Sequence, residues 1–310
     1  MNISSARKTG MLLFLALLPV AGCERTNLYY DDDPEGGVEI KVDWSGLPQG
    51  AFLPEGVLIT FYDPEKGTNH PFFRETAGGK ISMPDGEYDI LVYNGDTERL
   101  LFRNMDRFET AEAYLETRSR GNVEAFIGEP DPNFAVFSGH VSLATGQKEP
   151  VIVKPQCQVS FTAIKVKLVG VDNVKACRGS LSGVSRCLNL STGTPGRESC
   201  TLIFDLEKDG DTYTQKIAFF GLCPNSGGTR AENEVKNLLT LDFLLLDNTV
   251  RTFEYDITDK IEPGETPDTG KPLEIEGIEI PDIESPDGGG FDAGIGGWDQ
   301  EEDIPLGPTK

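Results

Sequence analysis

The sequence predicts an all-β protein built from antiparallel β-sandwiches. Apolar and polar residues alternate with a period of two in several runs, such as residues 38–42, which is the pattern of a half-buried strand. These runs follow one another closely and are separated by Gly, Pro, Asn and Asp. One stretch, residues 108–117, has helical spacing instead, since Ala111, Tyr114 and Leu115 can share a face. Many short strands joined by turns, with one short helix, indicate antiparallel sandwiches.

The length of the chain favours two such domains. Of the 310 residues, 288 remain once a leader at residues 1–22 is removed (310 − 22), which is about two domains of usual size. The period-two pattern starts afresh after Pro155. We therefore expect an N-terminal β-sandwich at residues 38–155 and a C-terminal β-sandwich at residues 156–260.

Turn residues mark the strand ends within each domain. Residues 84–86 (Pro-Asp-Gly) form a tight turn, residues 94–96 and 208–211 have hairpin chemistry, and His70 lies in an expected turn. The alternation changes phase between Ala163 and Ile164, which predicts a β-bulge. The expected strands are residues 38–42, 57–62, 80–83, 87–93, 123–127, 134–137 and 151–154, then 159–169, 181–190, 200–206, 212–220, 237–246 and 250–257.

The first 22 residues have the layout of a secretory signal peptide. Arg7 and Lys8 give a positive start, residues 11–18 form an apolar run too short to cross a bilayer, and small residues lead into Cys23. An aliphatic residue and two small ones before a cysteine resemble the lipobox of bacterial lipoproteins. The resemblance implies that Cys23 is cleaved at its amino side and carries two or three acyl chains, enough for lasting attachment to a membrane.

A short acidic tether follows the lipidated cysteine. Residues 23–37 contain Asp31, Asp32 and Asp33, then Pro and two glycines, which is typical of a solvated linker. Acidic residues in this position resemble the signal that sends lipoproteins of Bacteroidetes to the outer face of the outer membrane. The expected location is therefore the outer membrane, lipid-anchored and exposed at the cell surface.

The last fifty residues form an acidic tail rich in Pro and Gly. Residues 261–310 hold fourteen acidic residues against Lys271 and Lys310, and their composition predicts disorder. Three large apolar residues, Phe291, Ile295 and Trp298, interrupt this polar tail. We consider two roles for them, docking on the protein's own sandwich or adding a strand to the sheet of a neighbour.

Charge excludes two classes of partner. The chain has 51 acidic and 28 basic residues, a net charge of −23. Nucleic acids and anionic lipid surfaces both need a basic footprint, so neither is an expected partner. The acidic runs at residues 31–33 and 301–303 could bind calcium weakly, but neither has the alternating ligand spacing of an EF-hand loop.

Five cysteines follow Cys23, all in the second half of the chain: Cys157, Cys177, Cys187, Cys200 and Cys223. Their odd number leaves one thiol unpaired, and their connectivity does not follow from sequence. Cys177 and Cys187 flank a Gly/Ser-rich stretch that we interpret as a turn, so this pair is the candidate disulfide. No C-x-x-C motif is present, so we expect no metal site.

The sequence holds no catalytic constellation that we can identify. It lacks G-x-S-x-G, H-E-x-x-H and phosphate-binding glycine motifs, and its two histidines, His70 and His140, have the surroundings of surface or strand residues. We therefore expect a protein that is not an enzyme and that needs no cofactor.

Several stretches together resemble a family of Bacteroidales lipoproteins that is related to fimbrillin-like proteins and to the anchor subunits of their fimbriae. The resemblance implies two tandem transthyretin-like β-sandwiches, fimbrillin-like partners and strand exchange in assembly. The five later cysteines depart from the family pattern. The stretches that carry the resemblance are Cys23 with Glu24, and residues 28–31, 42–44, 59–62, 83–94, 96–98, 101–103, 113–114, 253–258 and 288–291.

Three functions are compatible with this sequence. The first is an anchor or accessory subunit of a fimbria-like adhesive structure, which needs a lipid and stable β-domains but no catalytic residues. The second is a glycan-binding accessory lipoprotein of a polysaccharide importer, which would use exposed aromatic residues. The third, and least favoured, is a hydrolase.

Overall fold

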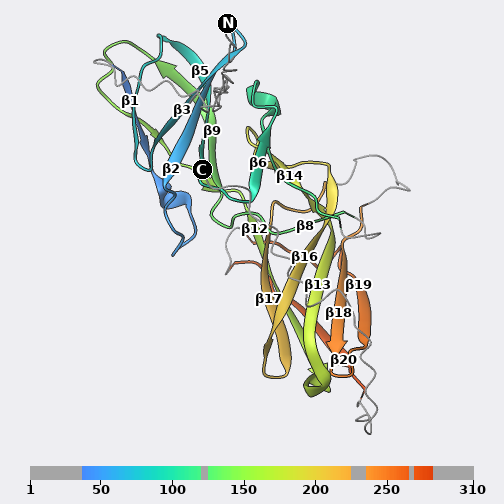
Figure 1. Ribbon diagram of the computed structural model, residues 1–310. Helices are drawn as coiled ribbons and strands as arrows, with labels where there is room; N and C mark the ends of the chain where they lie inside the picture. Colours follow the sequence, from blue (N-terminus) through green and yellow to red (C-terminus); the bar gives the residue numbers. More distant parts are fainter. Residues whose placement is uncertain (1–36, 120–124, 225–234, 265–268, 282–310) are drawn as a thin grey trace, which may run out of the picture.

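The all-β expectation is confirmed. A computed structural model describes residues 37–119, 125–224, 235–264 and 269–281 (Figure 1). These residues form three sheets, with three short 3-10 helices: η1 (Trp44–Gly46), η2 (Phe108–Thr110) and η3 (Val171–Asn173). Two curled sheets give the tandem β-sandwich architecture that the sequence predicts, and the third sheet lies between them.

The N-terminal sheet has eight strands in the order β10-β1-β4-β3-β2-β5-β9-β11. Its two edge strands, β10 and β11, are separated in the chain by only Lys154 and Pro155. The sheet must therefore curl until its edges approach each other. Its strands are β1 (Val38–Val42), β2 (Gly56–Asp63), β3 (Thr68–Glu75), β4 (Gly78–Ile81), β5 (Gly86–Asn94), β9 (Ala135–Leu143), β10 (Val151–Val153) and β11 (Gln156–Cys157).

A closed apolar core fills the inside of this curl. Ile40 and Ile59 are completely buried there. Phe61 makes edge contacts with the rings of Phe72 and Tyr88, each at a centroid distance of 5.9 Å. Alternating residues of β1, β2 and β5 supply this core, because successive side chains of a strand point to opposite faces.

The C-terminal sandwich is one folded sheet in the order β19-β18-β13-β16-β17-β12-β20. β16 belongs to both layers of the sandwich, because its residues 199–206 pair with β13 and its residues 207–209 pair with β17. Its strands are β12 (Ser160–Val169), β13 (Val174–Ser185), β16 (Ser199–Asp209), β17 (Thr212–Phe219), β18 (Leu238–Leu245), β19 (Val250–Asp256) and β20 (Leu273–Glu279).

A bridging sheet joins the two halves of the chain. Its order is β15-β14-β7-β6, with β6 (Leu100–Arg103), β7 (Glu112–Leu115), β14 (Cys187–Asn189) and β15 (Thr194–Pro195). β7 precedes Pro155 and pairs with β14, which follows it, and β8 (Phe126–Ile127) pairs in parallel with β16. Figure 1 shows β6, β14 and β8 between the two larger sheets. The boundary at Pro155 stays a proposal, and two strands before it, β7 and β8, pair with strands after it.

Aromatic contacts make the core continuous between the halves. The ring of Phe102 lies 4.9 Å from that of Tyr93 and 6.1 Å from that of Phe134, and Phe134 lies 6.3 Å from Phe220. Tyr93 belongs to the N-terminal sheet, whereas Phe220 directly follows β17. The part of the outer face of the N-terminal sheet that carries Tyr62, Leu91 and Tyr93 is therefore buried in this shared core rather than exposed to solvent.

Three local expectations are wrong. The helix at residues 108–117 is reduced to η2, and most of the remainder is the strand β7, because pairing with β6 and β14 overrides its helical spacing. His70 lies in β3, opposite Phe61, and not in a turn. β12 pairs with β17 in one register from Ser160 to Lys167, so no bulge falls at Ala163; the register shift occurs on the β20 side.

Candidate functional site

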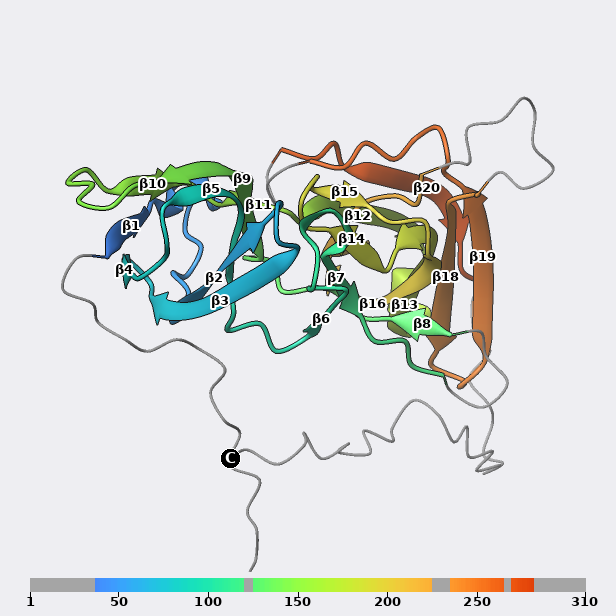
Figure 2. The ribbon, with the colours of Figure 1, turned by 90° about the horizontal axis from the view of Figure 1, so that it is seen from above.

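The most distinctive element of the C-terminal sandwich is its last strand. β20 comes from the acidic tail and pairs in parallel with the edge of β12, with Leu273 opposite Ile164 and Ile275 opposite Val166 (Figure 2). The prediction of disorder from composition is therefore wrong for these residues. Their alternation of Leu or Ile with Glu is a strand signal that the Pro- and Gly-rich surroundings obscure.

The alternation of β20 divides it into two faces. Leu273, Ile275 and Ile278 are buried against the sandwich core, whereas Glu274 and Glu276 are exposed. Two residues of β20, Glu276 and Gly277, stand opposite one residue of β12, which is a β-bulge. Gly277 has a φ of +81°, a conformation that glycine adopts without strain.

Hydrogen bonds fix both ends of the tail segment. Phe161 and Gly264 exchange two backbone hydrogen bonds of 2.9 and 2.8 Å before β20 begins. After β20, the Ile280 amide donates to the Val169 carbonyl at 2.9 Å, and the Asn173 side chain donates to the Pro281 carbonyl at 3.1 Å. Among the described residues, β20 is the last strand in the order of this sheet and pairs with β12 alone.

A network of charges braces the bridging sheet. Glu198 accepts hydrogen bonds from the guanidinium groups of Arg103 and Arg186, the latter at 2.6 Å, and Arg103 also donates to Glu112 at 2.8 Å. The two guanidinium groups lie 5.0 and 5.9 Å from the ring centre of Tyr114. Hydrogen bonds from Arg103 first, and from Arg186, hold the pKa of Glu198 below its usual range.

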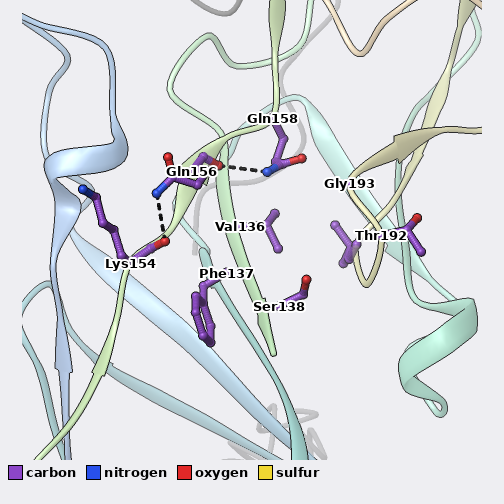
Figure 3. Close-up of a pocket in the computed structure, with 9 residues that line it drawn as sticks. Val136, Phe137, Ser138, Lys154, Gln156, Gln158, Thr192 and Gly193 are labelled. Carbon is purple, nitrogen blue, oxygen red and sulfur yellow. Dashed lines mark hydrogen bonds between the residues drawn. The ribbon is translucent and has the colours of Figure 1, made fainter. Parts of the chain in front are cut away.

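A polar depression of about 270 Å³ lies where the halves meet (Figure 3). The side chains of Gln156 and Gln158 donate to the backbone carbonyls of Lys154 and Gln156, at 3.2 and 3.1 Å. The Ser138 hydroxyl donates to the Ser191 carbonyl at 2.7 Å, which ties β9 to the loop after β14. Most of its polar groups already bond within the protein, so this depression serves the contact between the halves.

A larger groove, of about 400 Å³, crosses the outer face of the C-terminal sandwich. Phe126 of β8 forms part of one wall. Hydroxyl groups and carboxylates from four neighbouring strands, β13, β16, β18 and β19, share the lining. These include Ser180, Thr201, Thr240, Asp242 and Glu254.

The two site predictions from the ends of the chain lie outside the described residues. Cys23, the expected lipid attachment site, precedes residue 37, and Phe291, Ile295 and Trp298 follow residue 281. Both stay predictions. The described residues contain no helix long and apolar enough to cross a membrane.

The candidate disulfide between Cys177 and Cys187 is wrong. The residues between them are not a turn, because β13 continues as an extended strand to Ser185. A strand rises about 3.3 Å per residue, which carries these two cysteines far beyond bonding distance. The Gly/Ser-rich composition does not mark a turn here: Gly179 is a buried strand residue where an added Cβ would lie 2.2 Å from the Phe204 ring.

His140 is an exposed residue of β9, as expected. Its ring nitrogens lie 3.2 Å from an Asp89 oxygen and 2.9 Å from a Glu87 oxygen. These two hydrogen bonds, Asp89 first, raise the pKa of His140. No serine or cysteine nucleophile is hydrogen-bonded to this ring among the described residues, and that part of the chain holds no cluster of three or more metal-ligating side chains.

These features define a tandem β-sandwich protein whose two halves share one core and whose C-terminal sheet is completed by a strand from the tail. The chain belongs to a family described as "Domain of unknown function (DUF5119)", whose model matches residues 22–205.

Two relatives span nearly the whole chain. A protein of Bacteroides ovatus strain ATCC 8483, named "Putative fimbrium anchoring subunit Fim4B", is 28% identical over 327 residues, which cover 96% of this chain and 97% of that protein. The second is known from the crystal structure of "a putative adhesin from Bacteroides ovatus ATCC 8483". The two structures superpose with a TM-score of 0.62 and 27% sequence identity, and the match covers 89% of this chain and 100% of the adhesin chain.

Proposed function

We propose that this protein is a non-catalytic, lipid-anchored cell-surface protein that acts as an anchor or accessory subunit of a fimbria-like adhesive structure. The similarity to a relative named as a fimbrium anchoring subunit extends over almost the full length of both chains, which supports a shared role. The similarity to an adhesin structure covers that whole chain as well. An anchor needs stable β-domains, a membrane attachment and a partner-binding element.

The docking of β20 is the observation that carries this proposal. It is a tail strand that completes a sheet by pairing along an edge, with Leu and Ile on one face and Glu on the other. Edge pairing is also how one chain adds a strand to another, because backbone hydrogen bonds give affinity and alternate side chains give register. In this proposal the tail beyond Pro281, with Phe291, Ile295 and Trp298, pairs with a fimbrillin-like neighbour.

The proposed attachment is a lipid on Cys23 in the outer membrane. Two or more acyl chains anchor a protein stably, since each buried methylene contributes about 0.8 kcal/mol. The tether at residues 23–37 would then hold the N-terminal sheet away from the membrane. A net charge of −23 supports a protein partner rather than nucleic acid or anionic lipid.

The direct test is co-purification from membranes with the lipid retained. The full chain is compared with a chain that ends at Pro281, which keeps β20 and removes the proposed tail strand, and with the triple substitution F291S/I295S/W298S. Fimbrillin-like subunits should be recovered with the full chain and lost with both variants. Equal recovery with all three would contradict the tail as the binding element, and the absence of such subunits from every sample would contradict the anchor role.

The groove on the C-terminal sandwich favours a second candidate, binding of a glycan beside a polysaccharide importer. Hydroxyl and carboxylate side chains can bond sugar hydroxyls, and Phe126 can pack against a sugar ring. This role predicts saturable polysaccharide binding that is weakened about tenfold by Phe126→Ala. The matched control is Phe73→Ala, an exposed phenylalanine of β3. If the protein binds none of the polysaccharides in a broad panel, this second function is excluded.

A further inference from the structure

Two buried cysteines meet at the corner where the chain leaves the C-terminal sandwich for the bridging sheet. Cys187 is the first residue of β14, and Cys223 lies shortly after β17. Their exposed fractions are 1% and 7%. The backbone places Cys223 beside the end of β13, because its amide donates to the Gly183 carbonyl at 2.8 Å.

Both sulfur atoms lie against the same glycine. A Cβ atom added at Gly196 would lie 2.2 Å from Sγ of Cys187, so this sulfur occupies the space that a side chain would need. Sγ of Cys223 lies 3.8 Å from the carbonyl oxygen of Gly196. The Ser185 hydroxyl also donates to this carbonyl, at 2.9 Å, and the Gly196 amide donates to the Cys187 carbonyl at 2.8 Å. Cys187 and Cys223 therefore share one small, closed site.

We propose that Cys187 and Cys223 are joined by a disulfide bond in the exported protein. The proposal relies on export to an oxidising compartment, which the expected signal peptide at residues 1–22 would provide. A new S–S bond forms as the two thiols lose two protons and two electrons. An oxidised dithiol protein of the envelope, or glutathione disulfide, accepts them, and its own disulfide is reduced to two thiols.

The other described cysteines contact different parts of the fold. Sγ of Cys157 lies near the carbonyls of Pro132 and Val159, at 3.6 and 3.8 Å, and Sγ of Cys200 lies 3.3 Å from the Ala125 carbonyl. Cys177 is buried within β13. Among the described cysteines, the site at Gly196 is thus the one that two of them share.

The environment also determines when the bond forms. Burial, and then the neighbouring Cys187, raise the pKa of Cys223, and burial raises the pKa of Cys187. The reactive species in disulfide formation is the thiolate, so both groups react slowly once they are enclosed. Oxidation therefore takes place while the chain folds. The closed loop contains β15, β16 and β17, and the bond fastens the bridging sheet to the C-terminal sandwich.

The test is peptide mapping without reduction, on full chain recovered from cells that export it. Trypsin places each cysteine in a different peptide, since Cys187 falls in residues 187–197, Cys200 in 198–208 and Cys223 in 217–230. After alkylation under denaturing conditions, we expect peptides 187–197 and 217–230 to be recovered as one linked species that separates on reduction. Full alkylation of all five thiols, or linkage of either cysteine to another peptide, would overturn the proposal.

A thermal measurement provides a second readout. Reduction of the exported protein should lower its unfolding midpoint by about 5 to 10 °C, because the bond closes a long loop. The same reductant should not change the unfolding midpoint of Cys223→Ser. In the matched control Cys157→Ser, it should lower the midpoint as much as in the wild-type protein. A midpoint in the wild-type protein that does not respond to reductant would contradict the bond independently of the mapping.

Discussion

Glu198 is the residue on which the charges of the bridging sheet converge. It accepts hydrogen bonds from Arg103, which belongs to a strand before Pro155, and from Arg186, which lies after it. Replacing it leaves two half-buried guanidinium groups next to each other over the ring of Tyr114. The network thus joins the two halves through a carboxylate rather than through apolar contact alone.

We predict that Glu198→Gln lowers the free energy of unfolding by about 0.5 to 1 kcal/mol at pH 7, a modest value because the carboxylate is partly exposed. Its pKa is lowered in the folded state, so its contribution is present above the unfolded pKa and is lost as pH falls through the folded pKa. Urea unfolding at several pH values should show the two proteins converging in acid. The control is Glu207→Gln, an exposed residue of β16, the strand that begins directly after Glu198. A difference between the two proteins that persists in acid would contradict this account.

Glu129 has the opposite electrostatic behaviour. Burial raises its pKa, although its carboxylate accepts a hydrogen bond from the Ala218 amide at 3.2 Å. A pKa raised on folding makes the ionised form destabilising, so stability is lost as pH rises through the folded pKa. We predict that Glu129→Gln raises the thermal midpoint at pH 8 and that this gain disappears toward pH 4. The exposed control Glu116→Gln should change nothing, and a lower midpoint for Glu129→Gln at pH 8 would refute the prediction.

At the scale of elements, β20 is held by a few buried side chains. We predict that Ile275→Ala lowers the free energy of unfolding by about 2 to 4 kcal/mol, because it removes packing from a nearly closed core. The neighbouring Glu276→Ala, on the exposed face, should stay within about 0.5 kcal/mol of the wild type. Denaturant unfolding measures both. Equal effects of the two substitutions would mean that β20 is not docked in this register.

Particular elements show what the sequence could predict. β5 and β12 alternate strongly, and the expected strands at residues 87–93 and 159–169 match them nearly to the residue. The sequence does not predict β3, because Pro71 favours a turn. β3 pairs with β4 only at Glu75, so one of its edges needs no backbone N–H donor at Pro71. The sequence does not distinguish helix from strand at β7, because a strand of four residues carries too little periodicity. Contacts between residues far apart in the sequence determine the structure of β3 and β7. Such contacts also determine the docking of β20 against β12 and the site at Gly196 that Cys187 and Cys223 share.

At the scale of the whole molecule, the two halves share a core. Rings run from Tyr93 through Phe102 and Phe134 to Phe220, and the bridging sheet takes strands from both sides of Pro155. We predict that calorimetry of the full chain gives one cooperative transition, with a van't Hoff enthalpy close to the calorimetric one. Separate fragments 38–155 and 156–281 should each expose apolar surface and aggregate. Two resolved transitions would contradict the shared core and support independent domains.

The anchor proposal joins the lipid, the β-domains and the tail into one account, and it can be tested on cells. The measurement is the fraction of fimbrillin-like fibres found in the culture medium when Cys23 is replaced by Ala, with Cys157→Ala as the matched control. The account predicts that Cys23→Ala releases the fibres into the medium together with this protein, whereas the control retains them on the cells. Fibres that stay bound to cells after this protein has lost its membrane attachment would contradict it.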